Sequence, residues 1–197
     1  MRIILSLLLS TAPLPSRAAS VVPTLLDWKT IPASKQAGKP RQWRACREAA
    51  GGCAAYLREI VDYIEAIAEE HGLDPLILVS MAWHESRLNA FAEGSVGERG
   101  VLQIHPSNAK GLAFFEGGTK GERYRAACHD ELGACQYEVI ERAAEILARA
   151  IERCDGNVGS GLSAYNTGRC ISERGAAYSV KVQRTRDELA SSSMGAA

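Results

Sequence analysis

Glu85 is the residue of this sequence best placed for acid–base chemistry. It comes after a run of mostly apolar residues, Leu76 to Trp83, near the expected end of a helix. Apolar surroundings and the negative end of the helix dipole both disfavour a charged carboxylate, so they raise its pKa. A carboxyl group with a raised pKa can serve as a general acid near neutral pH. The helix alone leaves open a simpler interpretation, in which Glu85 only marks the point where the helix reaches solvent.

A glycine-rich stretch with one amide side chain follows Glu85. Gly94, Gly97 and Gly100 permit tight turns and close approach of a ligand to the backbone. Gln103 carries both a hydrogen-bond donor and an acceptor, which suits a sugar or an N-acetyl group. By itself, this stretch is equally compatible with a plain turn.

A second group of polar and aromatic residues lies further along the chain. Tyr165 offers a ring and a hydroxyl group and Asn166 offers an amide, a set that suits carbohydrate. A capped helix end explains these two residues equally well. Tyr178 fits either the core or a site.

Helices must position these residues, because apolar residues recur at helical spacing through most of the chain. The central helix is expected over 75–88, with Asp74 as its N-cap and Pro75 in its first turn. Its apolar residues cover nearly every face, which is typical of a buried helix. Other helices are expected at 54–71, 106–115, 134–153, 162–166 and 176–190. The fold class is therefore predicted to be mainly α, with a small β or irregular element over 89–105.

One domain is expected at residues 46–190, between an irregular arm (20–45) and a flexible tail (191–197). Residues 1–19 are typical of a signal peptide, with Arg2 before a short apolar run. That run is well short of the ~20 residues that a spanning helix needs, although an uncleaved anchor is the alternative. We expect an exported protein, periplasmic, in the cell envelope or secreted, with no stable membrane insertion after cleavage.

Charge and cysteine content narrow the function classes. The formal net charge is zero, which gives no support to a nucleic-acid partner. An even number of cysteines in an exported chain indicates disulfides. The preferred pairing is sequential, 46–53, 128–135 and 154–170, because each pair closes a local junction. There is no C-x-x-C motif and the histidines are scattered, so neither a metal site nor a cofactor is expected.

The motifs occur in a characteristic order: Glu85-Ser86, Asn89, Gly97, Gly100-Val101-Leu102-Gln103-Ile104, Pro106, Ala164-Tyr165-Asn166-Thr167-Gly168, and Tyr178 near Lys181-Val182. This order resembles the lytic transglycosylase domain of the soluble lytic transglycosylase (SLT) type, over residues 55 to 185. The resemblance implies a lysozyme-like, mainly α fold. It also implies cleavage of the β-1,4 bond between N-acetylmuramic acid (MurNAc) and N-acetylglucosamine (GlcNAc) in peptidoglycan.

The resemblance also implies roles for individual residues. Glu85 would be the catalytic acid and base, and no cofactor would be needed. The residues that would line the substrate site are Gln103, Tyr165, Asn166 and Tyr178, with Ser95 as a further contact. Glycan strands of peptidoglycan would be the partner, and a component of a secretion or conjugation apparatus is a second candidate partner.

The sequence departs from the family pattern at three positions. Glu98 stands where the family usually has Ala, and Leu102 where it usually has Met. Gly94 stands where family members often have Ser, and Ser95 is next to it. The side chain of Glu98 is expected to face solvent.

Two other functions remain as alternatives. A goose-type lysozyme would hydrolyse the same bond, and such enzymes often have an Asp where His105 stands, which favours the lyase. Asp130, Glu93 and Glu98 remain as candidate second carboxylates for hydrolysis. A peptidoglycan-binding module without turnover is the other alternative. The presence of Glu85 and Gln103 together argues against it.

Overall fold

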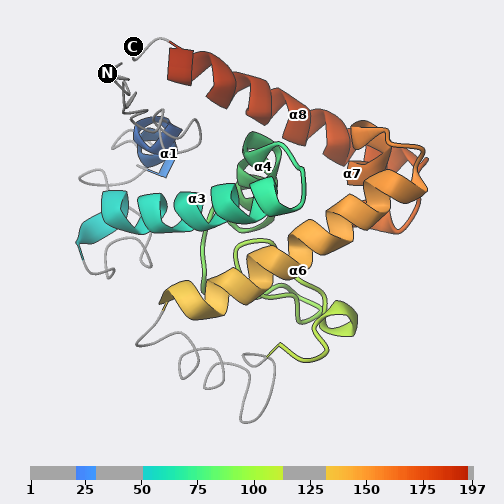
Figure 1. The fold of residues 1–197 in the computed structure, drawn as a ribbon, viewed down its shortest axis with the longest axis horizontal. Helices are drawn as coiled ribbons and strands as arrows, with labels where there is room; N and C mark the ends of the chain where they lie inside the picture. The colour runs from blue at the N-terminus through green and yellow to red at the C-terminus, as the bar shows by residue number, and fades with distance from the viewer. Residues whose placement is uncertain (1–20, 30–50, 113–131, 195–197) are drawn as a thin grey trace, which may run out of the picture.

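The computed structural model describes residues 21–29, 51–112 and 132–194. In this part of the chain the fold is mainly α, as predicted (Figure 1). In chain order the helices are α1 (Val22–Lys29), α3 (Gly52–Glu70), α4 (Pro75–Ser86), the 3-10 turn η3 (Pro106–Asn108), α6 (Leu132–Arg153), α7 (Val158–Thr167) and α8 (Glu173–Met194).

Helix α4 lies at the centre of the fold, among α3, α6 and α8 (Figure 1). Its residues 76–82 are all buried, as expected for a helix that is apolar on nearly every face. The side chain of Asp74 accepts a hydrogen bond from the backbone N–H of Leu76 at 2.9 Å and so caps the first turn. Arg87, with φ of 58°, ends the helix in the left-handed conformation. Glu85 is therefore next to the last residue of a rigid, buried element.

Two longer helices, α3 and α8, pack against α4, and α6 packs against α3. Helix α3 is amphipathic, and its buried stripe of Leu57, Ile60, Val61 and Ile64 contacts α1, α4 and α6. Helix α6 presents Val139, Ile140, Ala143 and Leu147 to the same core. Helices α7 and α8 pack against each other, and α8 also packs along α4. This last contact brings a late part of the chain to the end of the helix that carries Glu85.

The segment between α4 and η3 is an irregular loop with two isolated β-bridges, which agrees with the irregular alternative of the predicted small β or irregular element. Arg99 forms isolated antiparallel bridges with Glu93 on one side and with Ile104 on the other. The side chain of Arg99 is only 2% exposed, and its Nε atom lies 3.5 Å from Oε1 of Glu93. A buried charged residue is stable only when it is paired. The loop thus buries Arg99 together with the apolar side chains of Val101, Leu102 and Ile104.

Some boundaries differ from the sequence prediction. Residues 22–29 form helix α1, although an irregular arm was expected there, because Val22 and Leu25 are buried against α3. Tertiary burial stabilises this short helix despite its weak periodicity. Helices α7 and α8 are each longer than predicted, and only 106–108 of the helix expected at 106–115 is helical in the described residues. The signal peptide and the rest of the arm lie outside the described residues.

The disulfide between Cys154 and Cys170 is present, as predicted. It joins the end of α6 to the turn between α7 and α8. Cys53 is also disulfide-bonded, while Cys46 and Cys128 of the other predicted pairs lie outside the described residues. None of the described helices is long and apolar enough to cross a membrane.

Candidate functional site

Glu85 meets Tyr178 at the contact between α4 and α8. The hydroxyl group of Tyr178 donates a hydrogen bond of 2.6 Å to Oε1 of Glu85. Both side chains are partly buried. The two helices hold them in place, because α4 is enclosed by the core and α8 is anchored by the buried Val182 and Leu189.

The surroundings of Glu85 raise the pKa of its carboxyl group above 4.5, its ordinary value. Burial is the largest cause, because it disfavours the charged form. The hydrogen bond from Tyr178 opposes this effect, since a donor stabilises the carboxylate. The negative charge of Glu98 adds to the increase. Glu85 can therefore hold a proton at a pH where an exposed glutamate has lost it, and the Tyr178 hydroxyl group remains there to stabilise the carboxylate.

Tyr165 approaches the same place from α7. Its hydroxyl group donates a hydrogen bond of 3.0 Å to the backbone oxygen of Leu102. Burial, followed by the nearby charge of Glu85, raises the pKa of Tyr165 well above its ordinary value. The same two causes act on Tyr178. Both phenols are therefore neutral hydrogen-bond donors, and neither can act as a base near neutral pH.

Gln103 is held in a fixed orientation beside the loop. Its backbone has φ of 47°, an uncommon conformation for a residue other than glycine. Its Nε2 atom donates to the backbone oxygens of Ala92 and Gly100, at 3.1 and 2.9 Å. These two bonds fix which end of the amide is nitrogen, because the opposite orientation would place three oxygens together. The amide oxygen Oε1 lies beside Gly94, where a Cβ atom would be 3.0 Å from it.

Ser86 and Tyr56 attach the loop to the helices. The hydroxyl group of Ser86 donates to the backbone oxygen of Val101 at 2.7 Å. The buried Tyr56 of α3 donates to the oxygen of Leu88 at 2.8 Å and accepts from the N–H of Ala90 at 2.7 Å. Ser86, which the family motif places after Glu85, thus has a structural role in holding the loop against the end of α4.

Helix α6 contacts the loop from the opposite side. The buried Gln136 accepts a hydrogen bond from the N–H of Val101 at 3.2 Å. Gly100 has φ of +80°, and a Cβ atom there would lie 2.9 Å from Cγ1 of Val139. A side chain at position 100 would therefore be strained and would also push the loop away from α6.

Among the described residues, two of the predicted site residues lie outside this network. Asn166 is half-buried in the last turn of α7, directly after Tyr165. Ser95 is exposed within the turn that the hydrogen bond from Gly97 N–H to the Gly94 oxygen closes at 3.2 Å. Substrate contacts by Asn166 and by Ser95 both stay predictions.

Glu98 is less exposed than the sequence prediction of a solvent-facing side chain implies. It is half-buried, and its charge contributes to the raised pKa of Glu85. Its carboxylate lies over Gly94, beside Oε1 of Gln103. Gly94 and Glu98 both depart from the family pattern, and they lie within one turn. This combination is the sequence signal that could have indicated the half-buried position of Glu98.

The other candidate carboxylates are engaged elsewhere or lie outside the described residues. Glu93 pairs with Arg99, and Asp130 is not among the residues that the structure describes. His105 is exposed and hydrogen-bonds through Nδ1 to Ser107 at 2.7 Å. In the described parts of the chain, no group of three or more His, Cys, Asp or Glu side chains could hold a metal ion.

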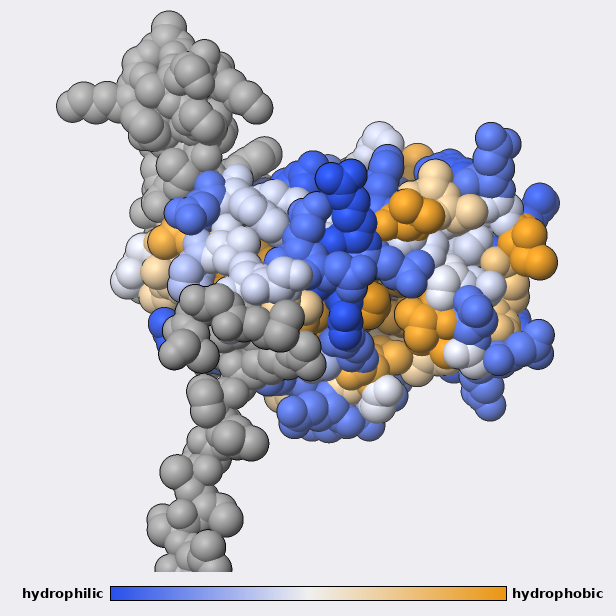
Figure 2. Space-filling model, turned by 90° about the horizontal axis from the view of Figure 1, so that it is seen from above, coloured by the Kyte–Doolittle hydropathy of each residue, from blue (hydrophilic) through white to orange (hydrophobic). Residues whose placement is uncertain are grey.

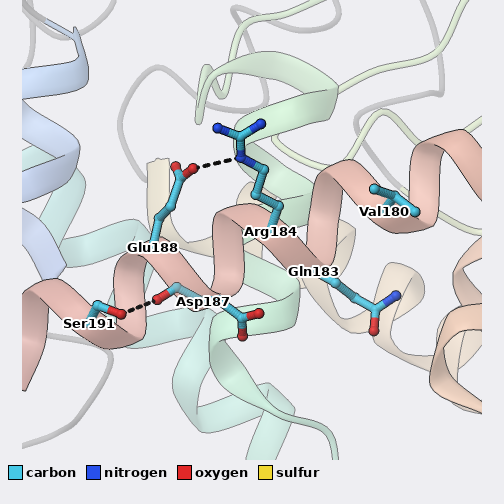
Figure 3. Close-up of a pocket in the computed structure, with 6 residues that line it drawn as sticks. All are labelled: Val180, Gln183, Arg184, Asp187, Glu188 and Ser191. Atoms are coloured by element: carbon cyan, nitrogen blue, oxygen red, sulfur yellow. Dashed lines mark hydrogen bonds and ion pairs between the residues drawn. The ribbon is translucent and has the colours of Figure 1, made fainter.

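A separate depression lies along the outer side of α8 and contains none of the predicted site residues (Figure 3). It is lined by Val180, Gln183, Arg184, Asp187, Glu188 and Ser191. Arg184 and Glu188, one turn apart on α8, form an exposed ion pair of 3.0 Å among these residues. The face that carries α8 is largely polar, with apolar residues in separate patches (Figure 2). Scattered apolar residues are normal on a protein surface and indicate no site.

Glu85, Gln103, Tyr165, Asn166 and Tyr178 all fall within residues 62–185, which match the family model of the transglycosylase SLT domain. This match extends over more than half of the chain. The chain therefore belongs to the transglycosylase SLT domain family. The family assignment confirms the resemblance and agrees with the lysozyme-like, mainly α fold.

Proposed function

We propose that this protein is a peptidoglycan lytic transglycosylase that cleaves the β-1,4 bond between MurNAc and GlcNAc. One observation carries the proposal: a carboxyl group with a raised pKa, Glu85, accepts a hydrogen bond from Tyr178 inside an SLT domain. The other members of the site would be Gln103, Tyr165 and Asn166. No metal or cofactor enters the reaction.

In the first step, protonated Glu85 gives its proton to the glycosidic oxygen. The bond from that oxygen to C1 of MurNAc breaks, GlcNAc leaves with a new O4–H group, and positive charge develops at C1. The hydroxyl group of Tyr178 stabilises the carboxylate that Glu85 becomes, since a hydrogen bond to the charged form favours it. General acid catalysis of this type contributes about 100- to 10,000-fold to rate.

In the second step, the Glu85 carboxylate takes the proton from the C6 hydroxyl group of the same MurNAc. The C6 oxygen forms a bond to C1, which closes a 1,6-anhydro ring. Glu85 is again protonated, and no water is consumed. One carboxylate acts twice, whereas most glycosidases divide these steps between two carboxylates.

The proposal is tested by mass spectrometry of the muropeptides that the purified protein releases from cell walls. We expect 1,6-anhydro-MurNAc ends from the wild type and a loss of about 100-fold or more in the Glu85→Gln variant. A folded Glu85→Gln variant with full activity would remove Glu85 from its role. An absence of released fragments from the wild type would favour a binding module.

Hydrolysis is the second candidate, and the charge of Glu98 near Glu85 is the observation that favours it. A second carboxylate can position an attacking water molecule. The same mass spectra separate the two reactions, since hydrolysis leaves reducing MurNAc ends, which are heavier by one water molecule.

The biological setting is part of the proposal. We place the protein in the cell envelope or periplasm, or outside the cell, where oxidising conditions suit the Cys154–Cys170 disulfide. Local opening of the wall for a secretion or conjugation apparatus would be its task. Deletion of the gene should then lower secretion or conjugation, and a Glu85→Gln copy should fail to restore either.

A further inference from the structure

Gly94 leaves open a space that the side chain of Glu98 occupies. The N–H of Gly94 donates to the backbone oxygen of Glu98 at 2.8 Å, which brings the two residues together across the turn. A Cβ atom on residue 94 would lie 2.8 Å from the carboxyl carbon of Glu98 and closer still to its Oε2 atom. Real Cβ contacts are not this short, so any larger residue at 94 would displace the carboxylate. The position of Glu98 therefore depends on glycine at 94.

The turn also holds the carboxylate of Glu98 in place. Its Oε2 atom accepts a hydrogen bond of 3.1 Å from the N–H of Val96. Glu98 is half-buried, so its side chain is in contact with both the loop and the solvent.

The loop that contains the turn is attached to the end of α4 at Ser86, next to Glu85 in the sequence. The same Cβ atom on residue 94 would also lie 3.0 Å from Oε1 of Gln103. Gln103 is fixed through its bond to the Gly100 oxygen, and the Ser86 hydroxyl group holds the loop against the end of α4. The Glu98 carboxylate and the Gln103 amide oxygen thus form one acceptor surface beside α4.

We propose that Glu98 is a positioning residue for Glu85: it is a second carboxylate of the site, which Gly94 allows to lie beside Gln103 in the loop that Ser86 attaches to the end of α4. Two carboxylates in one site take different roles when their environments differ. Glu85 is the more desolvated of the two, and Glu98 accepts a hydrogen bond from the turn and is partly solvated.

This inference deepens the proposed function and rests on it for its chemical consequence. A fixed negative charge beside Glu85 helps that residue to keep its proton until the glycosidic oxygen takes it. After the transfer, the same charge makes the new Glu85 carboxylate a stronger base toward the C6 hydroxyl group of MurNAc. It also favours the positive charge that develops at C1. Both steps gain from one group that exchanges no proton itself.

The pH dependence follows from the groups that face Glu85 in the described structure. These are Tyr178 on α8, Tyr165 on α7 and Glu98 on the loop. Both phenols stay neutral through the working range, because their pKa values are raised well above 10.0. Glu98 is then the only one of the three whose charge acts on Glu85.

The test is the Glu98→Gln variant of the mature protein, because glutamine can still accept the hydrogen bond from Val96 without carrying a charge. We expect kcat/KM to fall at least about tenfold and the alkaline limb of its pH profile to move to lower pH. The same shift should appear in the pKa of Glu85, measured by carbon-13 NMR of labelled glutamate carboxyl groups. Gly94→Ala, which displaces the carboxylate, should shift the pKa in the same direction.

The matched control is Glu152→Gln, which removes the same charge from an exposed position near the end of α6, outside the loop. This control should leave the pKa of Glu85 in place. An equal shift in both variants would mean that net charge alone acts on Glu85, and no shift in Glu98→Gln would mean a purely structural side chain. Either result overturns the proposal. The NMR titration needs no turnover, so it decides the role of Glu98 even if the wild type releases no fragments and the proposed function fails.

Discussion

The hydroxyl group of Tyr178 lies 2.6 Å from Oε1 of Glu85, although the two residues are 93 positions apart in the sequence. The bond links the end of the central helix α4 to the first half of α8. It lowers the pKa of Glu85, while burial and Glu98 raise it. The pKa of Glu85 thus depends on groups that lie on different elements. The side chains of Tyr178 and Glu98 can each be changed separately by mutation.

Replacing Tyr178 with Phe removes the group that opposes the increase in the pKa of Glu85. We expect the alkaline limb of the kcat/KM profile to move to higher pH, the opposite of the Glu98→Gln shift. Activity at the optimum should fall about tenfold or more, because a hydrogen bond to a charged group is worth about 1.5 to 3 kcal/mol. A pH–rate profile with purified peptidoglycan measures both effects.

Tyr165→Phe is the matched control for that variant. It also removes one phenolic hydroxyl group at the site, but this group donates to the Leu102 oxygen instead of Glu85. The free energy of unfolding should fall by about 1 kcal/mol, and the alkaline limb should stay in place. Equal limb shifts in the two variants would contradict the specific role given to Tyr178.

The buried carboxyl group of Glu85, which the proposed reaction needs, is expected to lower the stability of the folded protein at neutral pH. Its pKa is higher in the folded than in the unfolded state, so the folded state binds more protons between the two values. Stability therefore falls as the pH rises through that window. Glu85→Gln has no buried carboxyl group to ionise, so it should be more stable than the wild type at pH 7. The gain in the free energy of unfolding should exceed roughly 0.5 kcal/mol, the usual limit for a surface substitution.

Urea unfolding of both proteins measures this difference. The gain should disappear below pH 4.5, the ordinary pKa of the group, because Glu85 is then protonated in the unfolded state as well. A gain of the same size at pH 4 and at pH 7 would show that it does not come from the titration of Glu85.

Gly100 is predicted to be the glycine on which the loop geometry most depends. An alanine there would have φ of +80° and a Cβ atom 2.9 Å from Val139. We expect Gly100→Ala to lower the free energy of unfolding by about 2 kcal/mol or more, as the sum of backbone strain and overpacking. Gly111→Ala is the control, since it has the same φ of +80° but nothing within 4 Å of its Cβ atom.

Chemical denaturation of the two glycine variants isolates the packing contribution. Gly111→Ala should show the backbone cost alone, so it should be clearly the more stable of the two. Gly100→Ala should also lose activity at temperatures where it is folded, because the loop that carries Gln103 and Glu98 would move away from α6. Equal stabilities would mean that the contact with Val139 relaxes freely.

The Cys154–Cys170 disulfide should stabilise the junction of α6, α7 and α8. The two cysteines are 16 positions apart, and closing a loop of this size contributes about 3 kcal/mol in the chain-entropy model. The double variant Cys154→Ser/Cys170→Ser should therefore melt about 5 °C or more below the wild type. The double variant is preferable to a reductant, which would also act on the disulfide of Cys53. An unchanged melting temperature would show that packing alone holds the junction.

Much of the fold could be predicted from local pattern. The apolar run of α4, with Asp74 and Pro75 at its start, indicates a buried helix before any tertiary contact is known, and the stripes of α3 and α6 do the same. Helix α1 was missed because its stability comes from the burial of Val22 and Leu25 against α3. The early end of the helix expected at 106–115 was also missed, since no local signal in Pro106 to Asn108 limits it to a 3-10 turn.

The sequence by itself determined that Glu85 lies near the end of a buried helix, and the order of motifs identified the family. Only the tertiary structure decided which groups set the acidity of Glu85. Tyr178 meets it because α8 packs along α4. The charge of Glu98 acts on it from a turn in which Gly94 leaves room for the carboxylate. The physical reason is that desolvation, hydrogen bonds and charge act over a few ångströms in space, and residues 93 positions apart become neighbours only when the helices pack.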